Sequence, residues 1–527
     1  MPAVPDHEHA LRMPLLHTAD YVIVAAYLVV VVAVCIKVTR RSPDADELFL
    51  AGRSLGVGVV GLSLFASNIS STTLIGLPGA AWSTGISVAN YEWMAALVLV
   101  FTAVFVAPTL IGSRITTIPE LLERRFDGRM RRYLSATTLV LSVFLDTAGS
   151  LYAGAVVLML FVPGLSLGPT CVALAVFAGL YTAAGGLRAV AYTDVLQSIV
   201  LLLGSLILFV VVFGEFDYSW SAVTAAVPAE KLSLIRPLDD EALPWLGTLV
   251  GLPILGFYYW TMNQYVSQRL LGARDLQTAG KGAILAALLK LLPLFLMVLP
   301  GVMAVALFED LERPDTVFPR LIAEYAPPGL AGLMLAGLIA AIMSSVDSAL
   351  NSASTLVIND FVKPRRPRLD ARTLARLGRF TTLAMMVVAA LWAPAIDRFP
   401  GLFAYLQQAF AYVTPPLVAV FAMGFLWQGL GARAALRGLL TGHAVSAAWF
   451  VATQAGWLSV HFTIVAGILL LVTLAACAAW QAAVGEAPGA EQLAAVDPSA
   501  VPRMPTGVRL AALGVTALTL ALVAAFH

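Results

Sequence analysis

The sequence predicts an all-α protein that crosses a membrane many times, and three observations support this fold class. Of its 527 residues 60% are hydrophobic and only 12% are charged, whereas soluble proteins average about 25% charged residues. Apolar runs of about 20 residues, long enough to span the hydrocarbon core of a bilayer, recur along the whole chain. Two of these runs are interrupted by glycine and proline at positions five helices apart, which is typical of transporters built from inverted repeats.

Fourteen apolar runs are predicted to cross the membrane as helices. Most have about the length that a helix needs to span the hydrocarbon core. In chain order they cover residues 20–38, 55–82, 88–112, 133–161, 167–184, 190–213, 244–266, 281–308, 328–358, 378–396, 401–427, 434–454, 460–482 and 507–526.

The positions of Lys and Arg predict how these helices are oriented. The loops 214–243 and 309–327 are richer in Asp and Glu than the loops on the other side. Because loops rich in Lys and Arg stay in the cytoplasm, we expect both chain ends to lie outside a plasma membrane of the bacterial inner-membrane type. The basic residues follow the odd-numbered runs, at 37–41, 114–132, 188, 269–281, 363–379 and 433–437.

Several classes of function do not fit the sequence. A net charge of +1 gives no sign of nucleic-acid binding, and Cys35, Cys171 and Cys477 are far apart in apolar runs, as small core residues are. The six histidines show no metal-ligand spacing, and the sequence contains no GxxxxGK[ST] loop for nucleotides. Residues 1–19 lack the features of a cleaved signal peptide. We therefore expect neither an enzyme nor an organic cofactor, and an uncleaved first helix.

Two predicted helices are interrupted by polar residues, glycine and proline. In the second run the polar segment 68–73 is followed by glycine and proline at 76–79, and in the seventh the glycines and proline at 251–256 precede the segment 258–264. Unwound backbone at such a break exposes carbonyl groups to an ion and amide groups to a substrate. The alternative is a pair of proline kinks without function.

The ninth run ends in an unusually polar stretch. Hydroxyl, amide and carboxyl side chains recur between residues 344 and 355, although hydrocarbon does not tolerate such groups without partners. Ser344, Asp347 and Ser348 share one face of a helix, because they are three and four residues apart. Their oxygen atoms are the ligands that small cations prefer. The stretch predicts a cation site, and the alternative is a Ser- and Thr-rich contact between helices.

Seven segments make the chain similar to a known family. It resembles the sodium–solute symporter family, and within it the sodium–glucose cotransporter branch, over roughly residues 20–480 with the family's order and spacing. The segments are LFLAGRSLG (48–56), FASNISSTTLIGLPGAAWSTGISVANYEWMAALVLV (65–100), ITTIPELLERRF (115–126), GLYTAAGGLRAVAYTDVLQ (179–197), YYWTMNQYVSQR (258–269), AALLKLLPLFLMVLPG (286–301) and IAAIMSSVDSALNSASTLVINDF (339–361).

The resemblance implies a core of two inverted repeats, each of five helices, whose first and sixth helices are broken. The implied divisions are a leading part at 1–54 with an outside tail, a helix and a cytoplasmic loop, core repeat 1 at 55–213, an extracellular loop at 214–243, core repeat 2 at 244–427, and trailing helices at 428–527 with a mobile Pro- and Ala-rich linker at 484–506.

The resemblance also implies a sodium site where the first core helix breaks against the eighth. Five neutral oxygens there would bind Na⁺ without trapping it, which release requires. They are the carbonyls of Ala66, Ile69 and Ala341 and the hydroxyls of Ser344 and Ser345. A second Na⁺, held in some relatives one turn below, would here use Asp194, Ser344, Asp347 and Ser348. The alternative for Asp194 is that it stabilises a helix N-terminus.

A sugar site is implied by further positions. Glu92 and Lys290 are lone charges in apolar helices, and such charges are costly unless used or paired. They would grip sugar hydroxyls as acceptor and donor, since a polyol site needs both, and the alternative is a structural ion pair. Tyr259 would be an aromatic gate that stacks on the sugar from inside. The remaining expected positions are Gln407 for hydrogen bonding, Asn68 as support of the gate, and Leu77, Tyr91, Trp260 and Thr73 as lining.

Three departures from the sugar branch leave the identity of the sugar open. Thr73 replaces Gln or His, Gly256 replaces Asn, and Ala95 replaces Ser. Each change removes or shortens a hydrogen-bonding side chain of the expected site. Asp146, another ionisable residue in an apolar helix, has no role that the sequence assigns.

These observations predict a Na⁺-coupled symporter of a monosaccharide or related polyol that works by alternating access, functional as a monomer. The first alternative is a symporter of another small solute, such as a carboxylate, an amino acid or a vitamin. An anionic solute conflicts with Glu92 in the site. Further alternatives are a transporter-like sensor, a channel or an intramembrane enzyme.

Overall fold

The computed structural model describes residues 17–38, 45–162, 164–308, 311, 313–398, 402–497 and 499–526. Within these residues the chain is helical apart from loops and two isolated bridges, Leu55 with Ala273 and Arg236 with Pro244. The N-terminal tail before residue 17 and residues 39–44, which belong to the predicted leading part, lie outside the described residues.

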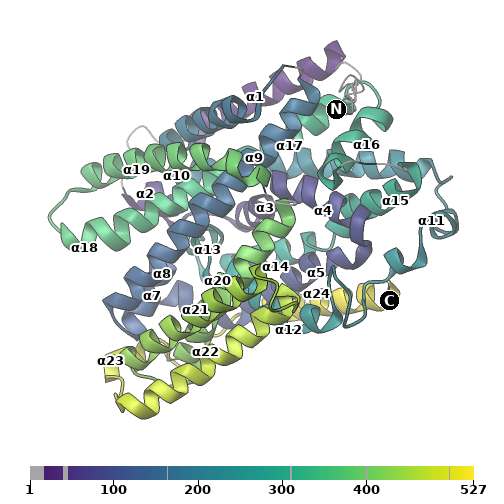
Figure 1. The fold of residues 1–527 in the computed structure, drawn as a ribbon. Helices are drawn as coiled ribbons and strands as arrows, with labels where there is room; N and C mark the ends of the chain where they lie inside the picture. The colour runs from purple at the N-terminus through teal and green to yellow at the C-terminus, as the bar shows by residue number, and fades with distance from the viewer. Residues whose placement is uncertain are drawn as a thin grey trace, which may run out of the picture.

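The helices follow one another with short connections (Figure 1). Their bounds are α1 Thr18–Val38, α2 Ala45–Leu50, α3 Val57–Asn68, α4 Ser71–Thr84, α5 Ala89–Phe101, α6 Ala107–Gly112, α7 Ile118–Arg125, α8 Gly128–Leu141, α9 Ala148–Phe161, α10 Leu167–Gly214, α11 Trp220–Ala226, α12 Trp245–Phe257, α13 Gln264–Leu271, α14 Leu276–Leu289, α15 Leu299–Leu307, α16 Val317–Tyr325, α17 Leu330–Leu356, α18 Lys363–Arg365, α19 Ala371–Trp392, α20 Leu402–Leu426, α21 Ala432–Gln454, α22 Phe462–Val484, α23 Ala490–Ala494 and α24 Thr506–Ala525.

Several of these helices continue into segments with π-helical hydrogen bonding. A π turn holds one extra residue and occurs frequently at functional sites. In the described chain the π segments are η4 Thr102–Val106, η5 Ser142–Thr147, η7 Tyr258–Met262, η8 Leu294–Val298 and η10 Val357–Val362. Two of them, η5 and η7, carry Asp146 and Tyr259.

Ten helical runs in the described residues are long and apolar enough to cross a membrane, and the bent pair α3–α4 would be an eleventh. The predicted run 167–184 contains only a shorter apolar helix, and 244–266 is divided between α12 and α13. The run 434–454 lies in α21, which is not among the ten. The polytopic all-helical fold is confirmed, and the count of fourteen spans stays a prediction.

Both predicted helices are interrupted, each within its polar segment, whereas Pro78 and Pro253 lie inside the continuous helices α4 and α12. The axes on either side of the first break, Val57–Asn68 and Thr73–Thr84, are bent by 54°. At this break the Ser70 amide donates to the Asn68 carbonyl at 2.7 Å instead of continuing the α-helical pattern. The second break is at Asn263, whose extended backbone (φ −65°, ψ 124°) separates η7 from α13. The Asn263 side chain then accepts a hydrogen bond from the Tyr265 amide at 3.3 Å and so begins the new helix.

The long helix α17 is the centre of the packing. It lies along α10, with α1, α3, α9 and α19 beside it, whereas α20, α21 and α22 form a separate layer with α12 (Figure 1). The α10 helix is itself divided by Gly186, whose positive φ of 62° lies where only glycine is unstrained. Because α3 lies beside both α10 and α17, the first broken helix runs through the interior of the bundle.

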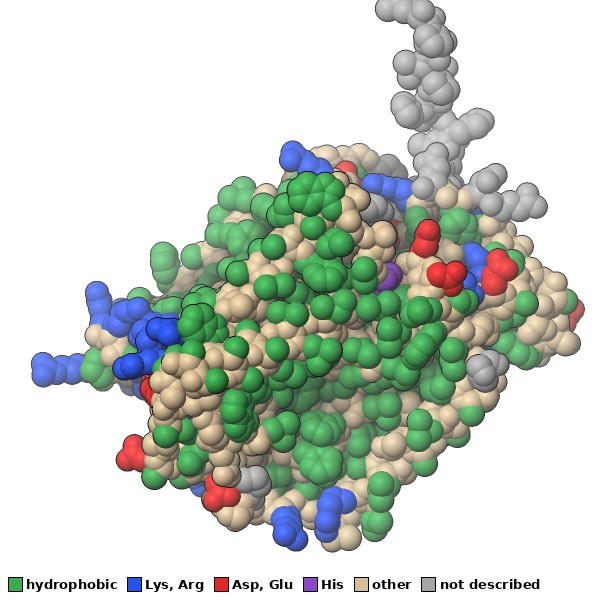
Figure 2. Space-filling model, turned by 60° about the horizontal axis from the view of Figure 1, so that its bottom comes forward, with side chains coloured by type: hydrophobic (Ala, Val, Ile, Leu, Met, Phe, Trp, Pro, Cys, Tyr) green, Lys and Arg blue, Asp and Glu red, His purple; other side chains and the backbone are tan. Residues whose placement is uncertain are grey.

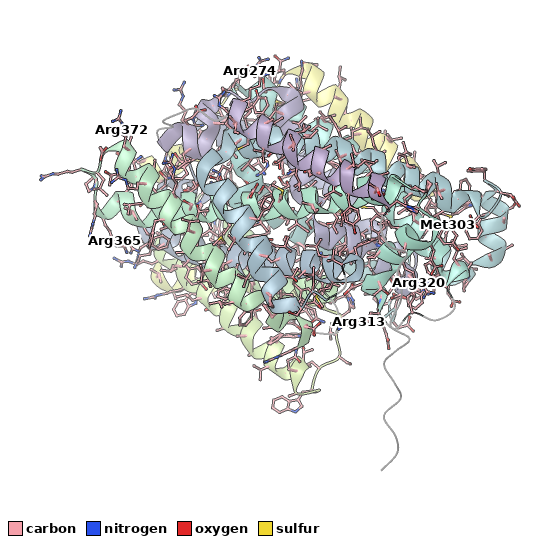
Figure 3. The ribbon with its side chains drawn as sticks, turned by 90° about the horizontal axis from the view of Figure 1, so that it is seen from above. Arg274, Met303, Arg313, Arg320, Arg365 and Arg372 are labelled. Carbon is pink, nitrogen blue, oxygen red and sulfur yellow. The ribbon has the colours of Figure 1, made fainter. Side chains whose placement is uncertain are left out.

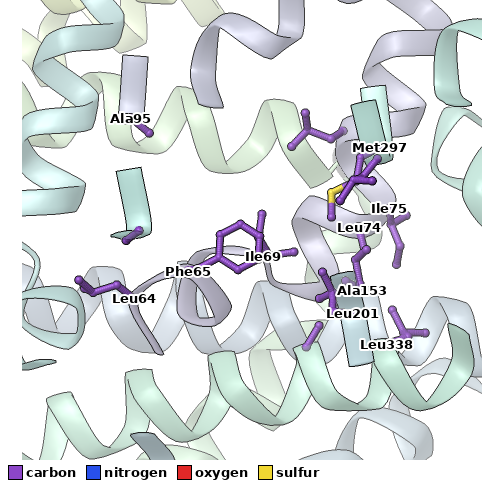
Figure 4. Packing of buried hydrophobic residues seen from close by; sticks show 14 of the residues in the cluster. Leu64, Phe65, Ile69, Leu74, Ile75, Ala95, Ala153, Leu201, Met297 and Leu338 are labelled. Carbon is purple, nitrogen blue, oxygen red and sulfur yellow. The ribbon is translucent and has the colours of Figure 1, made fainter. Parts of the chain in front are cut away.

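Apolar side chains surround the first break. Phe65 before the break and Ile69 at the break are fully buried, and Leu74 and Ile75 after it continue the core toward Met297 (Figure 4). Close packing on both sides leaves the unwound backbone at residues 69–70 little freedom to rearrange. The core thus holds the break in place.

The surface is arranged as a membrane requires. Figure 2 shows hydrophobic side chains covering a broad band of one face, with Lys and Arg gathered toward its margins. Figure 3 places Arg365 and Arg372 at one end of the molecule and Arg313 and Arg320 at another. This separation fits the predicted alternation of loops between two membrane faces.

The described ends of the chain lie on the same side. Asp20 at the start of α1 accepts hydrogen bonds from the amides of Gly329 and Gly332, at 2.9 and 2.6 Å, at the start of α17. At the other end, the Phe526 carbonyl accepts from the Leu234 amide at 3.3 Å. Leu234 lies in the predicted extracellular loop 214–243, and Gly329 and Gly332 follow directly on the predicted extracellular loop 309–327.

The contact between α15 and α4 leaves no room for a side chain at Gly301, because an added Cβ would collide with the backbone of Pro78. We expect Gly301→Ala to destabilise the protein by about 1–3 kcal/mol. Gly514→Ala in α24 is the control, since nothing lies within 4 Å of its added Cβ and alanine favours a helix by about 1 kcal/mol over glycine. Thermal unfolding of the purified protein in detergent measures both, and equal midpoints would contradict the packing argument.

Candidate functional site

A cavity of about 130 Å³ lies beside the two helix breaks. It is smaller than the ~300–1,000 Å³ of typical ligand pockets, so a bound solute would push its walls apart. Lining side chains come from segments far apart in the sequence, on α4, α5, η7, α17 and α20. The predicted site residues among them are Asn68, Thr73, Leu77, Tyr91, Glu92, Tyr259, Trp260, Ser345 and Gln407.

Lys290 does not line this cavity itself, but two residues that it contacts, Glu92 and Asn68, do. It is fully buried where α14 ends, and its ammonium donates hydrogen bonds to the Glu92 carboxylate and to the Asn68 side-chain oxygen. The same nitrogen lies 5.4 Å from the centre of the Trp260 ring, a cation–π distance. Pairing with Glu92 makes both charges tolerable in the membrane interior. Because Glu92 also lines the cavity, the pair presents both an acceptor and a neighbouring donor to it.

Tyr259 lies in a cluster of aromatic rings at the cavity. Its ring centre is 5.1 Å from that of Trp260 and 5.7 Å from that of Tyr265, the latter at 88°. The Tyr265 hydroxyl donates a hydrogen bond to the Tyr259 hydroxyl. Asn68, the predicted support, interacts with Tyr259 as well as with Lys290. The aromatic face expected for a gate is therefore present, and it is held from two sides.

Tyr265 is a residue that sequence reasoning missed. It comes six residues after Tyr259, which in an unbroken α-helix of 3.6 residues per turn would direct it about two-thirds of a turn away. The π segment and the break at Asn263 turn the chain, so that the two rings meet. Helical periodicity alone could not have paired them, although the family motif YYWTMNQYVSQR contains both.

The expected oxygens of the main sodium site lie on neighbouring helices, since α3 packs against α17. The carbonyls of Ala66 and Ile69 are at the end of α3, where the helical hydrogen bonds stop. On α17 the Ser345 hydroxyl donates to the Ala341 carbonyl at 2.9 Å, and the Ser344 hydroxyl donates to Asp194 at 2.6 Å. Each hydroxyl oxygen keeps lone pairs for a cation after donating its proton. The donor set suits a monovalent cation.

Asp194 lies next to this set in a fully buried network. Its carboxylate accepts hydrogen bonds from Ser63 and Ser344 and pairs with Arg269 at 3.0 Å. Arg269 also donates to the Ser63 hydroxyl at 2.7 Å, to the Ser348 hydroxyl and to the Tyr265 carbonyl. The structure thus brings Asp194, Ser344 and Ser348 together, with the guanidinium of Arg269 as their cation.

This network bears on the second sodium site that the resemblance implies. A second ion held by Asp194 and Ser348 would have to displace the Arg269 guanidinium. Asp347 is fully buried on α17 and interacts electrostatically with the Tyr27 side chain of α1. The second site and the role of Asp347 stay predictions.

Two further residues differ from their sequence-based description. Arg269 was counted with the basic residues of a cytoplasmic loop, but only 1% of it is exposed. Glu92 and Lys290 were singled out because each is an isolated charge in an apolar helix. This criterion misses Arg269, which is the last residue of the polar segment 258–269. Asp146, which had no assigned role, lines the cavity from η5 beside Asn263, and its Oδ2 atom is buried without a hydrogen bond.

The chain was compared with known families and proteins. The model of the Sodium:solute symporter family matches residues 48–442. A sodium/myo-inositol cotransporter 2 of Mus musculus is 36% identical over 486 residues, which cover 84% of this chain and 71% of the relative. A sodium/mannose cotransporter of Bos taurus is 37% identical over 470 residues, or 82% and 79% of the two chains. A sodium/glucose cotransporter 4 of Danio rerio is 32% identical over 84% and 73%.

Solved structures show the same fold. A Na⁺-coupled sialic acid symporter in a substrate-bound outward-open state aligns with a TM-score of 0.78 and 22% identity, covering 90% of this chain and 99% of that one. A nucleobase-cation-symport-1 family transporter in a closed conformation aligns with a TM-score of 0.57 and 16% identity, covering 87% and 99%. At these identities the likeness concerns the arrangement of helices.

Removing one partner of the Arg269–Asp194 pair should be strongly destabilising. Arg269→Met leaves a buried carboxylate without its cation, a cost of about 3–5 kcal/mol, and Arg269→Met/Asp194→Asn should regain most of it. The control is Arg274→Met, because Arg274 is exposed in its contact with Asp275. Unfolding midpoints in detergent measure the effect. A double variant no more stable than Arg269→Met would show that the pairing is not what holds these helices.

Proposed function

The chain belongs to the sodium:solute symporter family, and from this membership we propose that it carries a monosaccharide or a related cyclic polyol across a membrane together with Na⁺. The family predicted from the sequence motifs is confirmed, and its members are transporters. Na⁺ is the coupling ion of the relatives at 32–37% identity, whose names give myo-inositol, mannose and glucose as solutes.

One observation carries the proposal of a polyol. The same cavity is lined by a carboxylate with a bound ammonium, an amide and aromatic rings, from Glu92, Gln407 and Tyr259. Hydroxyl groups both donate and accept hydrogen bonds, so they need both kinds of partner, and the C–H faces of a sugar ring suit an aromatic wall. Thr73, Leu77, Tyr91 and Trp260 complete the proposed lining.

The proposed coupling follows from the position of Ser345, which lines the sugar cavity and is a predicted ligand of Na⁺. An ion bound by Ala66, Ile69, Ala341, Ser344 and Ser345 would hold α3 against α17 and so shape one wall of the cavity. Each Na⁺ that enters gains about 2.3 kcal/mol per 100 mV of membrane potential. This energy drives the uphill movement of the solute when the two are bound together.

We propose fourteen spans, with both chain ends outside a plasma membrane of the bacterial inner-membrane type, and a monomer as the working unit. In this arrangement the start of α1 and the end of α24 lie on the extracellular side. The first and second repeats at 55–213 and 244–427 contribute the two broken helices, and no residue is assigned a catalytic role. A carboxylate solute fits less well, since Glu92 and Asp146 both line the cavity while Lys290 is already paired.

Uptake into proteoliposomes tests the proposal. Radiolabelled myo-inositol, mannose and glucose are offered in turn with an inward Na⁺ gradient, and at least one should accumulate only when the gradient and an inside-negative potential are present. Equal uptake with K⁺ in place of Na⁺, or accumulation of small carboxylates alone, would refute the proposed substrate class or coupling ion.

Replacing the hydroxyl of Ser345 should weaken ion binding first. Ser345→Ala is expected to raise the Na⁺ concentration for half-maximal uptake about tenfold, equivalent to ~1.4 kcal/mol, with a smaller change in solute affinity at saturating Na⁺. Ser352→Ala is the matched control, because Ser352 is a fully buried serine two turns along α17 whose hydroxyl has no hydrogen-bond partner. An unchanged Na⁺ dependence in Ser345→Ala would remove Ser345 from the ion site.

Glu92 and Lys290 distinguish a solute site from a purely structural pair. If both contact the solute, Glu92→Gln and Lys290→Met each abolish binding and the double variant stays inactive. A structural pair behaves differently, because each single change strands a buried charge at a cost of about 3–5 kcal/mol and the double change can be nearly neutral. We expect an inactive double variant, measured by Na⁺-dependent binding together with unfolding temperature. Recovered uptake in the double variant would contradict the solute role.

A further inference from the structure

The carboxylate of Asp146 is a charge at the cavity that the proposed function does not use. It lines the cavity from η5, and its Oδ2 atom is buried without a hydrogen bond. Glu92 and Asp194, two other carboxylates of the site, each have a cationic partner, in Lys290 and Arg269. None of the described residues supplies such a partner to Asp146.

The surroundings of Asp146 are polar but uncharged. Its carboxylate interacts with the side-chain amide of Asn263 and electrostatically with the phenols of Tyr258, Tyr259 and Tyr265. Among the described residues that line the cavity there is no Lys, Arg or His. A carboxylate at membrane depth is costly without a counter-charge. The cavity therefore lacks one positive charge, which its occupant can supply.

Aromatic rings at the cavity add to the attraction for a cation. Tyr259, Tyr265 and Phe410 all line it. The ring centre of Tyr259 lies 5.7 Å from that of Tyr265 and 6.4 Å from that of Phe410, and both pairs are inclined at 88°. The faces of such rings attract a cation that lies within about 6 Å of the ring centre. A carboxylate beside aromatic rings is a combination that suits an ammonium group.

This position lies within reach of a solute bound by the groups proposed to hold hydroxyls. Tyr259 interacts electrostatically with both Asp146 and Glu92, and Gln407 lines the same cavity. An ionised carboxylate only accepts hydrogen bonds, and an ammonium only donates them, whereas a hydroxyl also needs a donor. A hydrogen bond between two charged groups is also stronger than one between neutral groups. An ammonium group therefore matches Asp146 better than a hydroxyl does.

We propose that the central cavity prefers a ring polyol in which one hydroxyl is replaced by a protonated amine, such as an amino sugar or an aminocyclitol, and that Asp146 binds the ammonium group. This inference rests on the proposed function and narrows its solute class. Such a solute carries a positive charge inward together with Na⁺. An inside-negative membrane potential then drives the solute itself as well as the coupling ion.

The test compares each parent solute with its amino-deoxy analogue. Na⁺-dependent uptake into proteoliposomes is measured for glucose, mannose and myo-inositol, for their amino-deoxy analogues, and for the N-acetyl forms of these analogues, which are uncharged. For the solute that is carried, wild type should reach half-maximal uptake of the amine at an about tenfold lower concentration than of the parent. Asp146→Asn should lose this preference, and acetylation of the amine should remove it in wild type.

The controls separate ammonium binding from a structural role. Asp239→Asn makes the same chemical change at an exposed position and should keep the preference. The unfolding midpoint of Asp146→Asn in detergent should not fall below that of wild type, because the variant removes a carboxylate without a counter-charge. A lower midpoint together with an unchanged preference would show that Asp146 is structural. If Asp146→Asn does not fold, Phe410→Leu takes its place and should reduce the preference several-fold.

The outcomes also separate this inference from the proposed function. Equal half-maximal concentrations for amine and parent in wild type, or a preference that survives in Asp146→Asn, would overturn the ammonium site and leave the Na⁺-coupled symport of a polyol intact. Absence of Na⁺-dependent uptake for all parents and all analogues would overturn the proposed function, and the ammonium site with it.

Discussion

The burial of charge in the membrane interior is the constraint on which this structure depends. A single buried charge is too costly to keep, so each one needs a counter-charge or a set of hydrogen bonds. Asp194 with Arg269 and Glu92 with Lys290 meet this requirement at sequence separations of 75 and 198 residues. In each pair the carboxylate comes from the first proposed repeat and the cation from the second. Separating the two repeats at these helices would therefore leave buried charges without partners.

The helix breaks depend on the same constraint. An unwound segment leaves backbone carbonyls without donors, and lipid offers none. The break after Asn68 lies inside a packed shell that includes Phe65 and Ile69, and its polar groups face protein rather than hydrocarbon (Figure 4). Pre-formed oxygens can then bind an ion with little reorganisation. The price is local stability, and the dense packing of α10 and α17 around the break offsets it.

Much of the site could be predicted because its residues are conspicuous in an apolar sequence. Glu92 and Lys290 are isolated charges, and 68–73 and 258–264 are polar interruptions, so hydropathy alone marks them. Tyr265 and Arg269 could not be placed this way. Their positions depend on the turn at Asn263, and Arg269 adjoins a basic loop that hides its burial. The cavity of about 430 Å³ lined by Tyr91, Gln408 and Tyr412 could not be predicted either, because part of its lining comes from loops, and sequence periodicity does not show which loops lie close together.

The short helix α13 has a consequence for leakage. Tyr265 near its start donates a hydrogen bond to Tyr259, the proposed gate, and Arg269 near its end binds Asp194 beside the proposed ion site. Tyr265 and Arg269 are about one turn apart in this helix of eight residues, so a tilt of α13 would displace both contacts together. A tilt that releases the tyrosine pair also pulls the guanidinium away from the carboxylate. Passage of an ion without the solute would then require one of these two contacts to open while the other stays closed.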